Sequence, residues 1–404
     1  MQQAETDILI AGGGMVGAAL AVALKNTGLR IEVIEAVPPR SAGQPSYDDR
    51  STALAWTSRR ILETMGVWQQ LASQAGPIEQ VHVSQKGRLG ITRLTAAEEN
   101  LPALGYVVPN RALGQALMEA LAGIPSITLT TPAKVMSVEH DANEVFAEIE
   151  RDGARQRLRA RLLVVADGAR SSLRESLGIG VRHWDYAQTA IVCNVSTELS
   201  HGNTAYERFT REGPMALLPL DAERMTLVLV EANARAAEVL ALDDEDFISH
   251  VQARFGDRLG RITRTGRRAS YPLALITAEQ QRAGRALILG NAAHSLHPIA
   301  GQGFNLSLRD VAVLAEVIAA NADDPGRGGA LDEYIAWRRR DQRNVAAFTD
   351  ILNRLFGIPF ETVAHARGLG LLAMDLLPGL RREFSRHAMG RAGRLPKLAR
   401  GLQP

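Results

Sequence analysis

Thr6-Asp7-Ile8-Leu9-Ile10-Ala11-Gly12-Gly13-Gly14-Met15-Val16-Gly17, near the start of the chain, is the stretch that decides the fold. A short apolar run is followed at once by glycines and then by an apolar, helix-forming run that continues to Leu24, which predicts a strand, a tight turn and a helix. Residues 31 to 35 form a second strand-like run. Together these segments predict a βαβ unit of about thirty residues, the size that a right-handed parallel crossover needs.

The glycines Gly12, Gly14 and Gly17 have the spacing G-x-G-x-x-G, which is typical of dinucleotide-binding turns. The triplet alone is weak, because a chain with 36 glycines forms such spacings by chance. Its position makes it strong: it follows a strand, opens a helix, and is followed about twenty residues later by Glu35, whose carboxylate can accept from ribose hydroxyls.

Each glycine has an expected role. Gly12 permits the tight turn, Gly14 lets the backbone approach a pyrophosphate, and Gly17 lets the helix pack on the sheet. The helix N-terminus then supplies N–H groups and a positive dipole for the phosphates.

The alternative interpretation of these glycines is a glycine-rich turn that binds no ligand. No second fingerprint of this kind occurs in the sequence, which argues against a resident NAD beside a resident FAD.

The composition bounds the class of protein. The chain has 404 residues, 46% hydrophobic and 22% charged, which predicts two or three globular units and excludes a disordered, collagen-like or disulfide-rich protein. The 46 basic and 44 acidic residues nearly cancel, so no nucleic-acid partner is expected. Cys193 is the single cysteine, which excludes an intrachain disulfide and a cysteine metal cluster.

Two apolar stretches resemble export or membrane segments. Residues 8 to 24 are preceded by Glu5 and Asp7, where a signal peptide needs positive charge. Residues 286 to 308 lack charged side chains but contain several histidines, amides and glycines, which indicates a loop-bearing site. We therefore expect a cytoplasmic protein without a transmembrane helix.

The remaining chain predicts further elements by periodicity. Residues 127 to 160 alternate apolar and polar side chains, with Asp152-Gly153 at a hairpin turn, and residues 161 to 166 form a continuous apolar strand. Residues 186 to 271 predict a second, antiparallel layer inserted into the first domain, before another buried strand over 286 to 289. Helices are expected over 52–65, 111–121, 243–255, 303–320 and 331–356.

Two later segments each follow a buried strand and precede a helix. They are Val164-Val165-Ala166-Asp167-Gly168-Ala169-Arg170-Ser171-Ser172 and Gly290-Asn291-Ala292-Ala293-His294-Ser295-Leu296-His297-Pro298-Ile299-Ala300-Gly301-Gln302-Gly303-Phe304-Asn305. With the glycine fingerprint, they make the chain, over about residues 6 to 355, resemble the single-component flavin aromatic hydroxylases of the para-hydroxybenzoate hydroxylase type.

Finer features resemble the FAD-dependent hydroxylases of ubiquinone biosynthesis. They are Asp49-Arg50-Ser51-Thr52-Ala53-Leu54, Gly105-Tyr106-Val107-Val108, Ala205-Tyr206-Glu207-Arg208-Phe209, Leu217-Leu218-Pro219-Leu220 and Tyr271-Pro272-Leu273. Within that family, the segment from Gly290 to Asn305 is most similar to the 2-octaprenyl-6-methoxyphenol hydroxylases. Most of the wider family has Asp where Asn291 stands; an amide can still donate and accept there.

The resemblance implies an α/β fold: a Rossmann-like FAD-binding domain of the glutathione-reductase type, an inserted antiparallel β-sheet substrate domain and a helical C-terminal region. The expected ranges are 1–75, 100–180 and 273–330 for the discontinuous FAD-binding domain, 76–99 and 181–272 for the substrate-binding domain, and 331–404 for the C-terminal region.

The resemblance also assigns residues. The expected cofactor-binding residues are Gly12, Gly14, Gly17, Glu35, Arg50, Arg111, Asp167, Gly168, Asn291, Gly303 and Asn305. The expected catalytic residues, in the loop beside the flavin, are His297, Pro298, Gly301, Gln302 and Gly303. A helix starting at this loop would stabilise negative charge on reduced flavin.

Several of these residues have a second interpretation. Asp167 could instead be the N-cap of the helix that starts near Ser171. Arg50 and Arg111 contact the pyrophosphate or belong to a solvated helix face. His297 is a proton carrier or a structural histidine. No metal site is predicted, because His294 and His297 have no third ligand in the sequence around them.

The implied reaction is a ring hydroxylation. NAD(P)H reduces FAD, dioxygen forms a flavin hydroperoxide, and one oxygen is transferred to a polyprenyl phenol of the 2-octaprenyl-6-methoxyphenol type, with water excluded. The alternatives are a sister hydroxylase acting at another ring carbon, a polyprenyl reductase, or a flavin-binding scaffold of a quinone-synthesis complex. The sequence does not identify the group that deprotonates the phenol, the ring carbon, the tail length or the preference between NADH and NADPH.

The C-terminal tail has a distinct composition. Residues 361 to 404 carry eight arginines and lysines against three acidic residues, interleaved with large apolar side chains. A basic amphipathic tail could dock on the inner face of the cytoplasmic membrane or bind a partner of a biosynthetic complex. It could equally pack on the enzyme body or form a homodimer contact.

Overall fold

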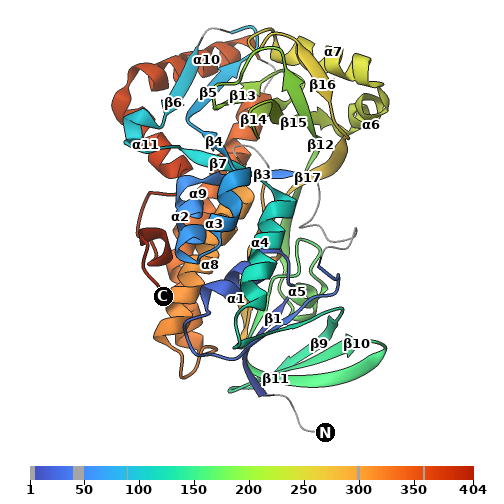
Figure 1. The fold of residues 1–404 in the computed structure, drawn as a ribbon, viewed down its shortest axis with the longest axis vertical. Helices are drawn as coiled ribbons and strands as arrows, with labels where there is room; N and C mark the ends of the chain where they lie inside the picture. Colours follow the sequence, from blue (N-terminus) through green and yellow to red (C-terminus); the bar gives the residue numbers. More distant parts are fainter. Residues whose placement is uncertain (1–4, 40–49, 89, 298–300, 358–359) are drawn as a thin grey trace.

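The computed structural model describes residues 5–39, 50–88, 90–297, 301–357 and 360–404. Two bodies lie one above the other in Figure 1, and the long strands β12 (Val181–Thr197) and β17 (Ala269–Ala278) run between them. The lower body holds the parallel sheet that the first glycine-rich segment predicts, and the upper body holds the inserted sheet. The functional site lies where the two meet.

The lower sheet has a parallel centre in the order β19-β11-β1-β2-β8, with β18 antiparallel at the edge beside β19. Ile8, Leu9 and Ile10 of the central strand are fully buried, as a strand covered on both faces requires. The strands on this path are β1 (Glu5–Ala11), β2 (Ile31–Ile34), β8 (Ile127–Thr130), β11 (Ala154–Val165), β18 (Arg282–Ala283) and β19 (Ala286–Ile288), and β9 and β10 extend the sheet from β11.

One face of the lower sheet is covered by helices. The helix α1 (Met15–Ala23) packs against α4 (Asn110–Ala122) and α8 (Gln302–Ala320), and α8 packs against α9 (Gly328–Gly357). Smaller elements on this side are α2 (Trp56–Thr64), α3 (Trp68–Leu71), η2 (Ala72–Gln74) and η6 (Leu398–Arg400).

The opposite face of the lower sheet packs on the strands β9 (Lys134–His140) and β10 (Val145–Arg151), which continue antiparallel from β11, and on α5 (Ser172–Ser176). The predicted hairpin at Asp152-Gly153 is confirmed, since Arg151 pairs with Ala154 across that turn.

The upper sheet has the order β20-β17-β12-β15-β14-β13-β5-β6, with β16 beside β12. Its apolar side packs on α6 (Asn233–Ala241) and α7 (Asp244–Phe255). Its other strands are β5 (Gln80–Gln85), β6 (Ile91–Thr95), β13 (Thr204–Phe209), β14 (Pro214–Pro219), β15 (Arg224–Ala232), β16 (Ile262–Thr265) and β20 (His294–Ser295).

Small elements complete the junction between the bodies. A short sheet has the order β3-β7-β4, formed by β3 (Ser51–Ala55), β7 (Gly105–Pro109) and β4 (Gly76–Ile78). Next to the upper sheet lie α10 (Glu361–Leu376) and α11 (Pro378–Ala388), with η3 (Ala97–Glu99) after β6 and η4 (Gly290–Ala292) after β19. Among the described residues, no helix combines the length and the apolarity that crossing a bilayer requires.

Two details of the sequence analysis are corrected. The helix predicted over 52–65 begins only at Trp56, because residues 51–55 pair with β7 as a strand. The upper sheet is mixed rather than wholly antiparallel, since its neighbouring strands β5 and β13 are parallel. The chain segment that connects them, between residues 85 and 204, includes β1's partner strand β11 in the lower sheet. The domain ranges stay a prediction; the expected boundary at residue 273 falls inside β17, which remains paired with β12 as far as Ala278.

Candidate active site

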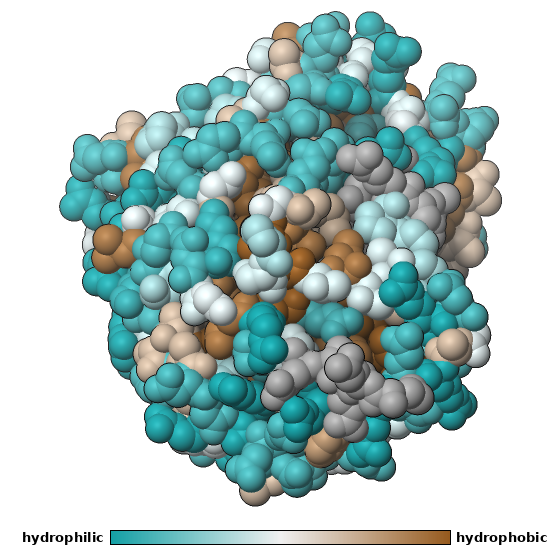
Figure 2. All heavy atoms as spheres, turned by 60° about the horizontal axis from the view of Figure 1, so that its bottom comes forward, coloured by the Kyte–Doolittle hydropathy of each residue, from teal (hydrophilic) through white to brown (hydrophobic). Residues whose placement is uncertain are grey.

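A cavity of about 950 Å³ lies between the two bodies, at the upper end of the size range of small-molecule and cofactor sites. One half is lined by the turns that follow the parallel strands, and the other by the upper sheet and the C-terminal helices. On the face that Figure 2 presents, a hollow with hydrophobic residues on its floor is surrounded by a largely hydrophilic rim.

The nucleotide half of the cavity is built from the carboxyl ends of four strands. In the sheet register, Ala11 of β1 pairs with Ile34 of β2 on one side and with Val165 of β11 on the other. Val165 pairs in turn with Ile288 of β19. The segments after these strands therefore meet at one edge of the sheet, although they are far apart in the chain. This edge is where open α/β sheets bind ligands.

Gly12 and Gly17 have the roles that their spacing predicts. Gly12 has φ +106°, and a Cβ on it would lie 2.5 Å from the Ala166 carbonyl oxygen, so the turn has room only for glycine. A Cβ on Gly17 would lie 1.9 Å from the Gly12 carbonyl oxygen, which explains how α1 approaches the turn so closely. Gly12 and Gly14 line the cavity, whereas Gly17 supports the turn from behind.

Glu35 holds the turn and faces the cavity. Its Oε2 accepts from the Gly13 backbone N–H at 2.6 Å, and its Oε1 accepts from the Val37 N–H at 2.8 Å. The side chain is buried at the end of β2. Each carboxylate oxygen has a second lone pair, so the same group can also accept from a ribose hydroxyl.

Asp167, Gly168 and Asn291 line the same half of the cavity, after β11 and β19 respectively. The N-cap of α5 is Ser171, whose Oγ accepts from the Arg174 N–H at 3.0 Å. Ser171 is therefore the N-cap residue, while the Asp167 carboxylate in the cavity wall also hydrogen-bonds Ser171 and the Leu173 backbone N–H in the first turn of α5.

The second helix to begin at the cavity is α8. Its N-cap Gly301 is left-handed, with φ +59°, and Gln302 and Gly303 follow it along the cavity wall. A Cβ on Gly303 would meet no protein atom within 4 Å, so the space beside it is open. Gln302 is buried and donates to the Ala388 carbonyl oxygen at 3.3 Å, which joins this loop to α11.

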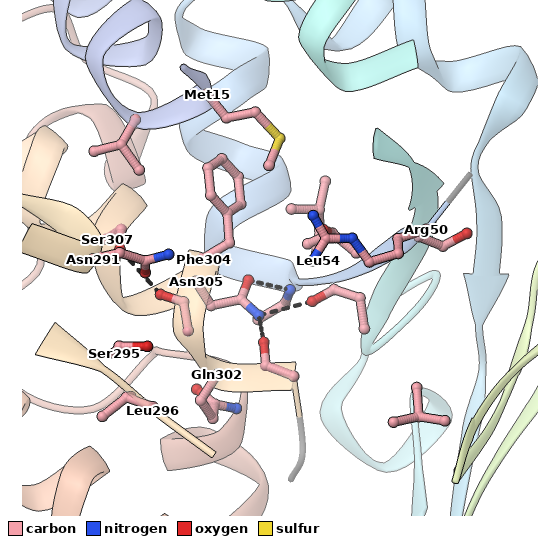
Figure 3. A pocket seen from close by; sticks show the side chains of 18 of the residues that line it. Met15, Arg50, Leu54, Asn291, Ser295, Leu296, Gln302, Phe304, Asn305 and Ser307 are labelled. Atoms are coloured by element: carbon pink, nitrogen blue, oxygen red, sulfur yellow. Dashed lines mark hydrogen bonds between the residues drawn. The ribbon is translucent and has the colours of Figure 1, made fainter. Parts of the chain in front are cut away.

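Asn305 fastens strand β3 to the start of α8. Its Nδ2 donates to the Ala53 and Gly301 carbonyl oxygens at 2.8 and 2.7 Å, and its Oδ1 accepts from the Ala55 N–H at 2.8 Å. Figure 3 shows these bonds at the centre of the cavity wall, with Arg50 and Phe304 nearby. Because its amide is committed to backbone groups, Asn305 positions the wall.

The two arginines differ in position. Arg50 lines the cavity, and its guanidinium carbon lies 4.3 Å from the centre of the Tyr271 ring. Arg111 is exposed at the start of α4 and lies outside the wall that the described residues form. Pyrophosphate contact stays a prediction for both, and the geometry favours it for Arg50.

The two histidines of the loop are buried and differ in their partners. His294 Nε2 lies 2.7 Å from Asp310 Oδ2, within a buried network that includes Arg338. His297 packs edge-on against Tyr186, with ring centres 5.2 Å apart, and burial lowers its pKa to about 4. The low pKa favours the neutral imidazole, and His297 is not part of the cavity wall that the described residues form, which favours the structural interpretation. Pro298 lies outside the described residues.

The substrate half of the cavity is largely apolar, and Glu207 is the acidic residue among the described residues of its wall. Aligned positions across four strands form a row: Val83 on β5, Glu207 on β13, Ala216 on β14 and Val228 on β15. All four line the cavity. A single acidic side chain therefore stands in a wall of small and branched apolar residues.

The C-terminal helices close this half. Their cavity-lining residues are Phe348 and Leu352 of α9, Leu371 and Met374 of α10, and Phe384, Ser385 and Ala388 of α11, followed by Met389. The Thr92 hydroxyl donates to the Leu371 carbonyl oxygen at 2.7 Å and ties α10 to β6. One side of the tail thus packs on the enzyme body.

The sequence analysis missed Glu207 and the tail residues as parts of the site. Ala205, Glu207 and Phe209 alternate along one strand, which places the carboxyl on the same face as two apolar side chains. An acidic residue on the apolar face of a predicted strand was the feature of the sequence that could have identified Glu207 as a site residue. Nothing in the tail sequence indicated which strands it would cover.

The nucleotide half fits FAD. Gly12 leaves a cradle that a Cβ would fill, α1 and α8 both begin at the cavity without a side-chain cap, and Glu35 offers acceptors between them. Backbone N–H groups at helix N-termini suit pyrophosphate and an anionic flavin ring. Among the described residues, no group of three or more histidine, cysteine and acidic side chains could hold a metal ion.

Comparison with known proteins identifies relatives over nearly the whole chain. Residues 5–349 match the family of FAD binding domains. The chain is 42% identical to ubiquinone hydroxylase UbiL of Rhodospirillum rubrum over 402 residues, covering 98% of this chain and 93% of the relative. It is 33% identical to the 3-demethoxyubiquinol 3-hydroxylase of Escherichia coli K12, covering 96% and 100% of the two chains.

Solved structures share the fold. The p-nitrophenol 4-monooxygenase PnpA of Pseudomonas putida superposes with a TM-score of 0.79 at 20% identity, covering 97% of this chain and 100% of that one. PqsL of Pseudomonas aeruginosa, described as a probable FAD-dependent monooxygenase, gives a TM-score of 0.77 at 23% identity, covering 91% and 99%. At these identities the likeness shows the architecture alone.

Proposed function

This chain belongs to the FAD-dependent hydroxylases of ubiquinone biosynthesis, and we propose that its substrate is a polyprenyl phenol of the 2-octaprenyl-6-methoxyphenol type. The observation that carries the proposal is the composition of the cavity. A nucleotide half with glycines and helix N-termini opens directly into an apolar half made by the upper sheet and the C-terminal helices. Such a wall suits a phenol with an isoprenoid tail, which gains from apolar burial.

The chain's own residues prepare the reaction. FAD, when bound, supplies the transfer of electrons from NAD(P)H to dioxygen and of one oxygen atom to the ring. Gly12 and Gly14 let the backbone approach the pyrophosphate, and Glu35 orients the ribose. The N-terminus of α8 stabilises negative charge near Gly303. Val83, Val228 and their neighbours exclude water from the reacting atoms.

The direct test is oxygen incorporation by the purified holoprotein. We expect 2-geranyl-6-methoxyphenol to stimulate NAD(P)H oxidation and to gain one oxygen atom from isotopically labelled dioxygen, detected by mass spectrometry. A protein that retains FAD but forms no labelled product with this phenol or a ring analogue would contradict the proposal and favour a scaffold role.

A sister hydroxylase acting at another ring carbon is the second candidate. The E. coli relative, at 33% identity, is named for hydroxylation at position 3 of demethoxyubiquinol. Expression in strains that each lack one ring hydroxylase separates the two candidates, because each strain accumulates a different methoxylated or unmethoxylated phenol. Restored quinone in the strain blocked at 2-octaprenyl-6-methoxyphenol supports the first candidate, whereas restoration only in another strain supports the second.

We also propose that the outer side of the C-terminal helices contacts an anionic bilayer. The tail patch consists of exposed apolar residues on and before α10 and α11: Phe360, Leu369, Leu372, Leu376, Leu377 and Leu380. Phe360 is 68% exposed, and Leu369 and Leu376 are each 66% exposed. Arg382 and Arg386 of α11 are exposed close to this patch in the sequence. Apolar side chains beside guanidinium groups suit a surface of acyl chains and anionic headgroups.

The opposite side of the same helices lines the cavity, so docking here would bring a lipid-soluble phenol close to its site. Flotation with phosphatidylglycerol and phosphatidylcholine vesicles tests this. We expect Leu369→Ser combined with Leu376→Ser to reduce binding to the anionic vesicles by about tenfold. The control Leu199→Ser removes an exposed apolar side chain of the upper body and should bind normally. Unchanged binding by the double variant, or its loss of self-association instead, would show that the patch serves another purpose.

A further inference from the structure

We propose that Glu207 is the catalytic residue that hydrogen-bonds the hydroxyl group of the bound phenol and accepts its proton. This inference deepens the proposed function and depends on it. It supplies a group for the deprotonation step that the sequence motifs did not identify.

The placement of Glu207 is the first observation. It lies in the middle of β13, paired with Val83 of β5 on one side and with Ala216 of β14 on the other. These neighbours and Val228 line the cavity together with Glu207. Its carboxyl therefore faces the same cavity that Gly301, Gln302 and Gly303 line.

The lack of a structural partner is the second observation. Within the described parts of the chain, no side-chain hydrogen bond or ion pair involves the Glu207 carboxyl. Its neighbour Arg208 is directed away, donating to the Arg254 carbonyl oxygen at 3.2 Å and to Ser84 Oγ at 3.4 Å. A half-buried acid in an apolar wall that only stabilised the fold would be hydrogen-bonded or paired, because leaving it without a partner costs free energy.

Among the described residues, no charged group contributes to the pKa shift of Glu207, and its cause is burial. From β5 and β14 the facing side chains are Val83 and Ala216, and α10 contributes Leu371 and Met374 to the same wall. His82 lies at the alternate position of β5, where its ring packs near Tyr206 with centres 5.7 Å apart. Burial alone raises the pKa of Glu207 to about 8.

This environment suits proton transfer from a phenol. The phenolic pKa of tyrosine is about 10, which lies roughly six units above an ordinary glutamate and only about two above a group that titrates near 8. A base with a pKa close to the working pH gains most from both its ionised fraction and its basicity. The apolar wall thus makes Glu207 a far stronger base than an exposed carboxylate.

The step conserves atoms and charge. The phenol O–H bond breaks, the proton moves to a Glu207 oxygen, and the electron pair stays on the ring oxygen, raising electron density at the ortho and para carbons. One oxygen atom of dioxygen is added at such a carbon. The second leaves as water with the two electrons of NAD(P)H. The ring carbon then loses its hydrogen as a proton, and Glu207 returns its proton to the phenolate oxygen.

The test uses the full-length FAD protein with 2-geranyl-6-methoxyphenol, NAD(P)H and dioxygen. We expect Glu207→Gln to lower kcat for hydroxylation by at least about 100-fold, the lower range for general-base catalysis. Flavin content and the melting temperature of this variant should be no lower than in the wild type. The matched control Glu223→Gln changes an exposed glutamate of the same domain and should behave as the wild type.

The pH profile separates a catalytic role from a structural one. We expect wild-type kcat/KM to rise with pH to a midpoint near 8, and this limb to be absent in Glu207→Gln. Glu207→Asp keeps an ionisable group and should retain the limb with a smaller loss of rate. Equal losses in the Asp and Gln variants, or a Gln variant within threefold of the wild type, would overturn the inference. A wild type that hydroxylates no phenol would instead refute the proposed function.

Discussion

The two halves of the cavity are built on opposite principles. In the nucleotide half, backbone atoms form the wall: a Cβ on Gly12 would lie 2.5 Å from the Ala166 carbonyl oxygen, and Glu35 and Asn305 hold backbone N–H and C=O groups in place. In the substrate half, side chains on a continuous sheet form the wall around Glu207. The turn at Gly12 and Gly17 should tolerate no added atom, and the substrate half should tolerate changes of size but not of charge.

The largest expected effect comes from adding one methyl group to the nucleotide half. Gly12→Ala places a Cβ against the Ala166 carbonyl at a left-handed φ, so we expect at least a 100-fold loss of FAD affinity, about 3 kcal/mol. Flavin absorbance after gel filtration measures this. In the substrate half, Val228→Ala should keep its flavin and lose only about 1 to 2 kcal/mol of stability. Equal flavin loss in both variants would contradict the proposed difference between the two halves of the cavity.

Removing the Asn305 amide should loosen the wall itself. Asn305→Ala leaves the Ala53 and Gly301 carbonyls and the Ala55 N–H without their partner, and we expect unfolding to become easier by about 3 kcal/mol. Urea denaturation of the holoprotein measures the change. Asn291→Asp, at an exposed cavity position, is the comparison and should retain flavin and most activity.

A smaller effect is expected at Glu35. Glu35→Ala should weaken FAD binding by about 1 to 3 kcal/mol, because a charged acceptor for the ribose and for the Gly13 and Val37 N–H groups is lost. Titration of the apoprotein with FAD measures it. Glu32→Ala, on the same strand, removes only a hydrogen bond from Thr130 and should bind FAD normally.

The last effect concerns how the stability of the protein depends on pH through the substrate half. Burial raises the folded-state pKa of Glu207 from 4.5 to about 8, so its contribution to stability is fully present below pH 4.5 and is lost as the pH rises to 8. The loss cannot exceed ~1.4 kcal/mol per pH unit. Glu207→Gln removes this dependence, so its stability relative to the wild type should increase from pH 5 to pH 8. Parallel denaturation curves at the two pH values would contradict it.

Much of this protein is determined by short stretches of sequence. The turn at Gly12 to Gly17, the apolar strands and the loop near Gly301 predict the α/β class, the flavin hydroxylase family and FAD, and the comparisons confirm all three. This works because a turn that needs glycine, and a strand buried on both faces, leave their mark on adjacent residues.

The tertiary structure decided what neighbouring residues cannot encode. Pairing of β1 with β11, about 150 residues apart, brings Asp167 beside Gly12. Packing of β3 on α8 gives Asn305 a positioning role in the wall, and its contact with the cofactor stays a prediction. Only the register of β13 between β5 and β14 shows that Glu207 lies between the apolar side chains of Val83 and Ala216 in the cavity wall. These outcomes depend on contacts between distant segments, whose strength is set by packing and by the burial of backbone groups rather than by local preference.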